Sequence, residues 1–482
     1  MELCYHLLTI HILFCLSSIT LAANLFNSKT DASALLSFKS HISSDPFGVL
    51  SSWNESVHHC QWQGILCGKR HPDRVTALLL DSKQFTGSIS PSLANLTFLQ
   101  RISLSDNQFH GIIPVEIGYL NRLRFLNLSM NFIEGIIPST LGNCSNLQVI
   151  ALRYNNLGGT IPPNLVQCKR LQAIDAGYNF LTGGIPPELG HIPQLRFLAL
   201  HVNNLTGSIP STLGNLSSLM ILGLHQNNFE GHIPDSLSNL TSLLEFFVNQ
   251  NSFSGFPPAL SNLNNLLELT LHQNRLSGTI PSSLGNLNNI QIISLYENKL
   301  SGFIPAAIGK LHNLWAFDIS ENNISGEIPH SLFNISTMFN LGLFFNRLEG
   351  TLPFHFSDGC PNLQYLLIYG NQLTGQIPAS ISNCSALTYL GLDSNSFSGT
   401  IPASFGFLEN LRLVSVASNK LEAKRSQDWI FLDAMANCTS LQFLELDNNK
   451  LEGTLSSSIG NLSTSLRKIS LSSNPISGNI PI

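Results

Sequence analysis

One motif recurs along most of the chain and limits what the chain can fold into. From about Val75 to the last residue, the pattern L-x-x-L-x-L-x-x-N-x-L-x-G-x-I-P repeats, in most places every 24 residues. Repeats of this length pack only on their neighbours, so the 482 residues favour one elongated array over several separate domains. With Lys83 in a degenerate first unit, we count about 17 units, the last one incomplete, whose aligned asparagines are Asn107, Asn131, Asn155, Asn179, Asn203, Asn227, Asn251, Asn274, Asn298, Asn322, Asn346, Asn371, Asn395, Asn419, Asn449 and Asn474.

The letters of the motif predict the structure of each unit. Alternating leucines such as Leu126 and Leu128 indicate a short strand with one face inward, and successive strands stack as a parallel sheet. A buried asparagine amide can donate and accept at once, so a column of asparagines can satisfy the backbone where the chain leaves the strand. The glycine and the Ile-Pro pair favour an extended outer segment. We therefore predict an α/β repeat solenoid, a superhelix with a concave parallel β-sheet.

Slips in the period mark local departures from this pattern. The step from Asn251 to Asn274 has 23 residues, and the step from Asn419 to Asn449 has 30. The longer step contains an extra segment around Lys424 to Phe431. This segment is too short for a domain, and we expect a surface loop or a helical turn.

The first residues precede the array and divide into two predicted parts. Residues 1–23 contain an apolar stretch followed by small residues, which predicts a secretory signal peptide, with a plain buried helix as the alternative. Residues 24–74 are predicted to cap the exposed end of the array 75–482, because Ala34, Leu35, Phe38 and Ile42 recur at helical spacing. No later segment reaches the ~18 apolar residues of a membrane span.

Cysteines support an oxidising compartment. A disulfide between Cys60 and Cys67 would hold the cap, with Trp53 and Trp62 sealing the first strand. The alternative is a metal site, which two cysteines without a second pair support weakly. For the cysteines that stand 11 residues before a repeat asparagine we expect small buried core residues rather than bridges, because their Cβ vectors should run parallel; these are Cys144, Cys168, Cys360, Cys384 and Cys438.

Asn-x-Ser/Thr sequons also favour export, because glycans attach only in the secretory pathway. Seven of them lie 12 residues before a repeat asparagine and would form one shielded line off the sheet. Asn127 instead falls on the concave face, where a glycan would move a ligand toward repeats 4 to 14. The predicted glycosylation sites are Asn54, Asn95, Asn127, Asn143, Asn204, Asn215, Asn239, Asn323, Asn334, Asn383, Asn437 and Asn461.

Composition excludes several functional classes. Only 11% of residues are charged and the formal net charge is -5, so nothing indicates nucleic-acid binding. No nucleophile, metal or phosphate-loop motif stands out, and none of the kinase Gly-rich, H-R-D or D-F-G motifs is present. We expect no enzymatic activity, no cofactor and no metal in this chain.

The cap motif W-N-x-S-x-x-x-C-x-W-x-G-I-x-C and the repeat N-x-L-x-G-x-I-P resemble the ectodomains of plant leucine-rich-repeat receptor-like kinases. The segments Asp428–Leu432, Asn437–Leu441 and Gly460–Thr464 are similar to the immune-receptor subfamily that senses flagellin or elongation-factor peptides. The resemblance implies an extracellular peptide-sensing ectodomain, secreted or at the cell surface, with a leucine-rich-repeat co-receptor kinase as partner. We expect a chain truncated before the membrane span and kinase, or a soluble decoy.

Strand residues that alternate with the inward leucines should face the concave surface, at positions 6, 4, 2 and 1 before each repeat asparagine. Exposed aromatic and histidine side chains on one surface are typical binding anchors, although an ordinary solvated sheet face is the alternative. The predicted ligand-binding residues are Arg153, Tyr154, Tyr178, His201, His225, Glu245, Phe247, Asn249, Glu268, His272, Tyr296, Glu297, Asp318, Phe344, Phe345, Tyr365 and Tyr369.

Charge on these four positions predicts the kind of ligand. They carry three basic residues (Arg101, Arg153 and Lys468) against eleven acidic ones, which are Asp81, Asp106, Asp175, Glu245, Glu268, Glu297, Asp318, Glu321, Asp393, Glu445 and Asp447. Opposite charge steers encounter, so we predict a peptide or protein ligand with a basic segment over repeats 8 to 11. Ten strands at ~4.8 Å span roughly 45 Å, the reach of about 13 extended residues.

Two further hypotheses remain open from the sequence. His201, His225 and His272 would charge near pH ~6 to 7 if unperturbed and could act as a pH switch, although solvated surface histidines explain them more simply. The rival function is a secreted leucine-rich-repeat inhibitor of a microbial cell-wall-degrading enzyme. The repeat number and the Asp428–Leu432 segment favour the receptor class.

Overall fold

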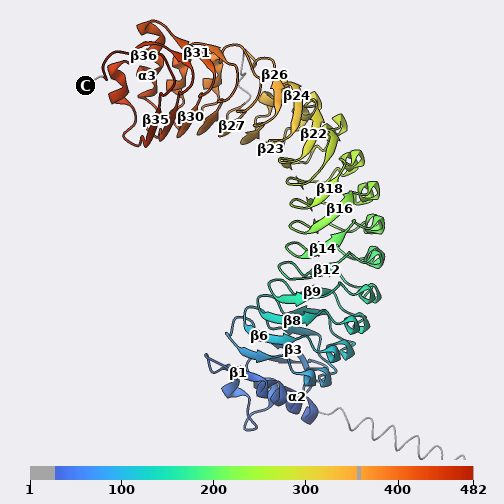
Figure 1. Ribbon diagram of the computed structural model, residues 1–482. Coiled ribbons are helices and arrows are strands. Elements are labelled where there is room, and N and C mark those ends of the chain that lie inside the picture. The colour runs from blue at the N-terminus through green and yellow to red at the C-terminus, as the bar shows by residue number, and fades with distance from the viewer. Residues whose placement is uncertain (1–27, 355–359, 481–482) are drawn as a thin grey trace, which may run out of the picture. The chain divides into compact units, whose positions relative to one another are not determined.

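The computed structural model describes residues 28–354 and 360–480, and the chain divides into two compact units, residues 1–228 and 229–482. The predicted signal peptide, residues 1–23, lies outside the described residues. Figure 1 shows the same arrangement within each unit. The strands of a parallel sheet follow one side, and short helical turns follow the opposite side. This is the repeat solenoid that the sequence predicts.

In the first unit, each repeat contributes a strand of three to five residues to the main sheet. The strands pair in parallel and in register, so that Ile150 lies beside both Leu126 and Ile174. The inward side chain of each strand is buried, and the next residues in the strand face outward. The strands are β3 (Val75–Leu79), β5 (Arg101–Ser103), β7 (Phe125–Asn127), β9 (Val149–Ala151), β11 (Ala173–Asp175), β13 (Phe197–Ala199) and β15 (Ile221–Gly223).

After the main strand, the chain makes a second, lateral strand and then a 3-10 helix. The Ile-Pro pair follows the lateral strand, and the proline is the N-cap or the first residue of the 3-10 helix. The lateral strands of the first unit are β4 (Thr86–Ser88), β6 (Gln108–Ile112), β8 (Phe132–Ile136), β10 (Asn156–Gly158), β12 (Thr182–Gly183) and β14 (Asn204–Gly207). The 3-10 helices are η3 (Pro91–Asn95), η4 (Val115–Tyr119), η5 (Ser139–Asn143), η6 (Pro163–Gln167), η7 (Pro187–His191) and η8 (Ser211–Asn215).

The second unit repeats this order. Its main strands are β17 (Glu245–Phe247), β19 (Glu268–Thr270), β21 (Ile292–Ser294), β23 (Ala316–Asp318), β25 (Asn340–Gly342), β27 (Tyr365–Leu367), β28 (Tyr389–Gly391), β30 (Leu413–Ser415), β32 (Phe443–Glu445) and β35 (Lys468–Ser470). Its 3-10 helices are η9 (Asp235–Asn239), η10 (Pro258–Asn262), η11 (Ser282–Asn286), η12 (Ala306–Lys310), η13 (His330–Asn334), η14 (Ala379–Asn383), η15 (Ala403–Phe407), η16 (Ser426–Trp429) and η17 (Ser457–Asn461).

The lateral strands of the second unit are also short and parallel. They are β16 (Asn228–His232), β18 (Ser252–Ser254), β20 (Ser277–Thr279), β22 (Lys299–Gly302), β24 (Asn323–Glu327), β26 (Arg347–Glu349), β29 (Ser398–Gly399), β31 (Lys420–Ala423), β33 (Lys450–Leu451), β34 (Gly453–Thr454) and β36 (Ile476–Ser477). These strands separate the main sheet from the helical side of each repeat.

The asparagine column satisfies the backbone at the turn after each main strand. Asn155 is typical: its Nδ2 donates to Leu128 O at 2.9 Å and Leu152 O at 3.1 Å, and its Oδ1 accepts from Ile133 N at 3.0 Å. One amide therefore joins three backbone groups of two adjacent repeats. The residue before the column asparagine takes a left-handed conformation, with φ of 56° at Tyr154, so its side chain departs from the strand alternation.

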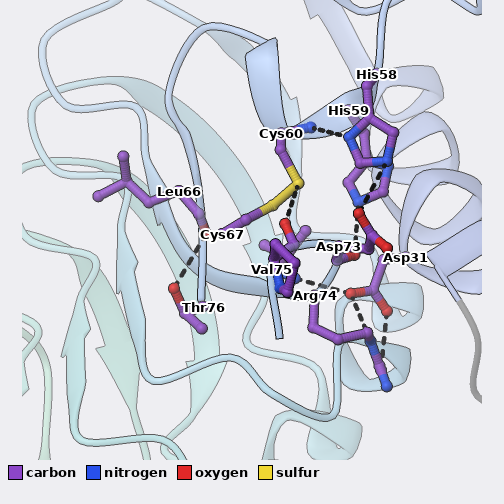
Figure 2. The surroundings of a disulfide bond; sticks show 11 residues. Asp31, His58, His59, Cys60, Leu66, Cys67, Asp73, Arg74, Val75 and Thr76 are labelled. Carbon is purple, nitrogen blue, oxygen red and sulfur yellow. Dashed lines mark hydrogen bonds and ion pairs between the residues drawn. A yellow bond between two sulfur atoms is a disulfide. The ribbon is translucent and has the colours of Figure 1, made fainter. Parts of the chain in front are cut away.

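The cap covers the first repeat with one helix, α2 (Ser28–Ser40), and with β1 (Ile42–Ser44), η1 (Val49–Ser52), η2 (His59–Gln61) and β2 (Ile65–Cys67). Strand β2 pairs antiparallel with β3. Asp31 is fully buried and accepts from Arg74 Nη2 at 3.0 Å and from Val75 N at 2.9 Å, which ties α2 to the first strand. Figure 2 shows this ion pair near the disulfide.

Cys60 and Cys67 form a disulfide bond with their Cα atoms 5.6 Å apart (Figure 2). The sulfur of Cys60 is therefore not available as a thiolate ligand for a metal. Trp53 and Trp62 are buried and stacked, with ring centroids 5.5 Å apart. Their indole N–H groups donate to backbone carbonyls of the cap, which holds the two rings in its core.

The expectation that the other cysteines are all unpaired core residues is wrong for one pair. Cys360 and Cys384 form a disulfide with Cα atoms 5.2 Å apart, whereas Cys144, Cys168 and Cys438 are free and buried. Both cysteines stand 11 residues before their column asparagines, so the side chains of equivalent positions can meet. The 5.2 Å between their Cα atoms lies within the range that a disulfide spans.

The insertion in the second unit folds as a helical turn, the second of the two alternatives predicted from the sequence. It forms η16 followed by α3 (Ile430–Met435), which packs against η15. Trp429, Phe431 and Leu432 are buried, and the Trp429 indole donates to Glu452 O at 3.1 Å. The apolar residues of the insertion therefore extend the core.

Candidate functional site

In the first unit, five of the predicted residues form one continuous cluster on the outward face of the main sheet. Tyr154 and Tyr178 stack at 4.1 Å between ring centroids, Tyr178 meets His201 edge-on at 5.3 Å, and His201 stacks on His225 at 4.5 Å. The Arg153 guanidinium lies 4.8 Å from the Tyr154 ring centroid and 5.0 Å from that of Tyr178. We call these five residues the Arg153 cluster.

The Arg153 cluster is an aromatic ladder with one cation at its end. Burial raises the pKa of the Asp175 carboxyl, while the Gly177 backbone N–H and the Arg153 charge oppose this shift. The Nε of Arg153 is buried and has no hydrogen-bond partner among the described residues.

His201 is buried, whereas His225 is half-buried, so the interpretation as a solvated surface histidine is wrong for His201. His201 is only 8% exposed. Burial, the neighbouring His225 and then Arg153 lower the pKa of His201 to about 4, and burial and Arg153 also lower the pKa of His225. His201 therefore does not serve as a switch between pH ~6 and 7.

We expect the ring of His201 to titrate with a midpoint near pH 4, because burial disfavours its charged form. Its folded pKa lies below the unfolded value of about 6.5, so its contribution to stability is present above pH ~6.5 and is lost as the pH falls through about 4. Ring-proton shifts in NMR spectra of the folded chain and of the urea-unfolded chain measure both midpoints. A folded midpoint near pH ~6.5 would contradict this prediction.

In the second unit, aromatic side chains form pairs along the sheet face. Phe344 stacks on Tyr369 with centroids 4.6 Å apart, and Phe345, 54% exposed, meets the same Tyr369 edge-on at 5.2 Å. Tyr365 stacks on the equivalent tyrosine of the next strand, Tyr389, at 4.9 Å. These rings lie in fixed positions, because each is held by a neighbour on an adjacent strand.

A second aromatic pair lies earlier in the same unit. His272 stacks on Tyr296 with centroids 4.3 Å apart, and His272 Nδ1 lies 2.9 Å from Ser294 Oγ. Burial raises the pKa of Tyr296, and the carboxylates of Asp318, Glu297 and Glu321 raise it further. The phenol and these carboxylates therefore share one surface.

Several carboxylates on this face lie in surroundings that disfavour their charged form and raise their pKa. Glu245 and Glu268 occupy directly opposed positions on β17 and β19. Burial, and then the charge of Glu245, raises the pKa of Glu268, and burial raises the pKa of Asp318 and Asp393. A cation bound among these groups would stabilise their ionised forms.

Most of the acidic residues at the four predicted positions lie in the second unit. Eight of the eleven acidic residues lie in the second unit, where the one basic residue on these positions, Lys468, is 2.8 Å from Glu445. The first unit has three acidic residues beside Arg101 and Arg153. The excess of carboxylates at these positions therefore lies on the second unit.

The remaining predicted contact residues occupy less distinctive places. Phe247 is partly exposed at the end of β17. Asn249 follows it, and its Oδ1 accepts from Thr270 Oγ1 at 3.2 Å. Glu297 is exposed and accepts from Gln273 Nε2 at 2.7 Å. These residues lie on the sheet face beside the aromatic pairs.

Six of the seven sequon asparagines of the predicted shielded line occupy equivalent exposed positions. Asn95, Asn143, Asn215, Asn239, Asn334 and Asn383 each end a 3-10 helix and are exposed. Asn127 differs, because it lies on β7, is half-buried, and accepts from Ser129 N at 3.1 Å. The glycan at Asn127 and the ligand boundary drawn from it stay predictions.

The four predicted positions of each repeat do not include another group of aromatic side chains. Trp315 and Phe339 stand seven residues before their column asparagines, just ahead of the main strands. Their rings stack at 4.6 Å, and Phe339 continues to Tyr365 at 5.3 Å. A tally of exposed aromatics at every position of the repeat would have found them.

Family models match in both units. The model of the leucine rich repeat N-terminal domain matches residues 28–68, and a leucine rich repeat model matches residues 264–324. Single-repeat models match residues 98–120, 122–144, 146–168, 194–216, 218–240, 362–384, 386–408 and 440–462. Within the described residues, no helix is long and apolar enough to cross a membrane.

Among curated relatives, the receptor kinase-like protein Xa21 of Oryza sativa subsp. japonica is 52% identical over 81 residues, which are 16% of this chain and 8% of the relative. The chain thus matches a small part of that relative's length. A solved plant peptide hormone receptor, RGFR1 in complex with RGF2, is 36% identical with a TM-score of 0.83, covering 88% of this chain and 69% of that chain. The Arabidopsis receptor kinase HAESA, solved with the peptide hormone IDA and the co-receptor SERK1, is 27% identical with a TM-score of 0.53, covering 94% and 91%.

Proposed function

We propose, from the premise that this chain belongs to the family of plant leucine-rich-repeat receptor ectodomains, that its sheet face recognises an extended peptide outside the cell. The predicted resemblance to this family is confirmed by the matched repeats and by the similar ectodomain structures. Two of the similar structures hold peptide hormones, which supports the same ligand class here. Recognition without catalysis is the proposed activity.

The observation that carries the proposal is the sheet face of the second unit. Phe344 and Tyr369 offer fixed rings, and Asp318 and Glu321 lie close enough to raise the pKa of the Tyr369 phenol further, after burial. Rigid aromatic anchors beside uncompensated carboxylates favour a peptide with apolar side chains and a basic segment. We propose that this segment binds between Glu245 and Asp393.

Further features support an extracellular setting. The disulfides Cys60–Cys67 and Cys360–Cys384 are typical of oxidising compartments. Exposed sequons at the ends of the 3-10 helices fit glycosylation on the side away from the sheet. A similar ectodomain was solved with a co-receptor, so we propose that a co-receptor kinase is a second partner of this chain.

The experiment that tests the function is a calorimetric titration of the purified chain with two peptides of about 13 residues. The peptides share their apolar positions and differ only in carrying Lys and Arg or Asp and Glu. We expect the basic peptide to bind and its affinity to fall as salt rises, because exposed charges are screened. Preference for the acidic peptide would contradict the proposal.

Titration against pH gives a second readout. Binding of a cation favours the ionised carboxylates, so protons are released on binding and the affinity should rise with pH. Because burial raises the pKa of Glu268, Asp318 and Asp393, the loss of affinity on acidification should begin above the usual carboxylate range around pH ~4. An affinity that stays constant from pH ~4 to 7 would count against the role of these groups.

A further inference from the structure

A pocket of about 400 Å³ lies in the second unit, at the edge where the chain enters the main strands. Four of its residues stand seven positions before a column asparagine, and four stand nine positions before one. None of the eight carries a charge, in contrast to the acidic sheet face of the same unit. The lining residues are Gln291, Asn313, Trp315, Thr337, Phe339, Asn362, Gln364 and Ala386.

The aromatic part of this pocket is a parallel stack. The rings of Trp315 and Phe339 are 4.6 Å apart between centroids and inclined by only 6°. Trp315 remains 46% exposed, which is unusual in this chain, because Trp53, Trp62 and Trp429 are buried. The stack holds the indole in place without covering it, so part of its surface is open to a ligand.

The polar part of the pocket consists of side chains that are held in place by hydrogen bonds to the backbone. Asn313 Nδ2 donates to Asn288 O at 2.9 Å, and Asn362 Nδ2 donates to Ser336 O at 2.8 Å. Thr337 Oγ1 lies 2.8 Å from both His312 O and Leu314 O. Since the amide nitrogens hold these side chains to the previous repeat, their carbonyl oxygens are oriented to accept from an external donor.

Two glutamines complete the set. Gln291 and Gln364 stand at the same repeat position as the two rings, one repeat before Trp315 and one repeat after Phe339. Each amide can donate and accept. The pocket therefore combines an aromatic surface, fixed acceptors and adaptable amides, with no charge among its lining residues.

We propose that this pocket binds a neutral oligosaccharide. A pyranose ring presents a C–H face that can lie against an aromatic surface, and its hydroxyl groups donate and accept in the plane of the ring. An apolar peptide side chain would cover the Asn313 and Asn362 oxygens without giving them donors, which is unfavourable. An anionic or a cationic ligand would find no counter-charge there. The volume is of the order of known small-ligand sites, about 300–1,000 Å³.

This inference is independent of the peptide proposal, because the pocket lies beside the strands and not on the acidic positions. Trp315 gives a direct readout. We expect neutral oligosaccharides to change the tryptophan fluorescence and to protect it from iodide quenching, since the other tryptophans are buried. The probes are an array of neutral oligosaccharides that includes β-1,4-linked glucose and N-acetylglucosamine tetramers, a galacturonic acid tetramer, and an uncharged leucine-rich tetrapeptide.

Variants measured by calorimetry on the full chain decide the assignment. Trp315→Ala should weaken oligosaccharide binding at least about 10-fold, and Trp315→Phe should retain part of it, because stacking contributes through the ring. Phe407→Ala, which removes a 73% exposed ring elsewhere in the same unit, should have no effect. Failure of every neutral oligosaccharide to bind, equal binding by Trp315→Ala, or binding of the galacturonic acid tetramer or the tetrapeptide alone would overturn the proposal.

Discussion

Reversing two exposed carboxylates, Glu297→Lys together with Glu321→Lys, is expected to weaken binding of a basic peptide by about 10- to 100-fold. Both side chains flank the aromatic pairs on the sheet face and contribute to the field at Tyr296. Their reversal replaces attraction by repulsion at the proposed centre of the interface. Titration calorimetry measures the affinity, and stopped-flow fluorescence measures the association rate, which should fall most at low salt.

A matched pair of substitutions separates this local effect from a change in net charge. Glu327→Lys with Glu349→Lys makes the same change in charge, and both residues are exposed on the lateral strands β24 and β26. At physiological salt these distant charges are largely screened. Equal loss of affinity in the two double variants would show that the sheet face has no special role.

Substitution of one column asparagine, Asn155→Ala, is expected to destabilise the first unit by about 3 kcal/mol. Asn155 is 6% exposed. Its loss leaves the Ile133 N–H without an acceptor, and removes a donor from the carbonyls of Leu128 and Leu152. Local opening should dominate, because each repeat depends on its neighbours.

Hydrogen exchange at the Ile133 amide measures this effect, alongside denaturant unfolding. Asn156→Ala is the matched control, since Asn156 is adjacent but exposed, and it should cost less than about 0.5 kcal/mol. Protection of Ile133 that is equal in the two variants would contradict the proposed role of the column. Asn179 and Asn203 make the same kinds of bonds, so the result should extend to them.

The sequence predicts most of the fold, because the same pattern of apolar and polar residues recurs in almost every unit. Leu126 and Leu128 each occupy a position whose equivalents recur in almost every unit, so an accidental pattern averages out. The column asparagines could be assigned to the turn for the same reason, and the structure confirms that assignment at Asn155. The helical insertion was left open, since Trp429 and Phe431 reveal their burial only when α3 packs on η15.

The candidate site was less fully predictable. Alternation placed Phe344 and Tyr369 on one face, but it could not show that they stack. It also left Trp315 out, because the residue lies before the strand, where alternation does not apply. His201 was expected to be solvated, yet neighbouring rings on both sides bury it and lower its pKa.

By itself, the sequence determined the repeat, the inward leucines, the asparagine column and the family resemblance, because these depend on periodicity along the chain. Only the tertiary structure decided which equivalent side chains meet across neighbouring strands. It paired Cys360 with Cys384 while leaving Cys144 and Cys168 free, and it gathered Trp315 and Phe339 around an uncharged pocket. The physical reason is that a contact between repeats depends on distances of a few ångströms across the sheet, and a pattern read along one chain carries no measure of them.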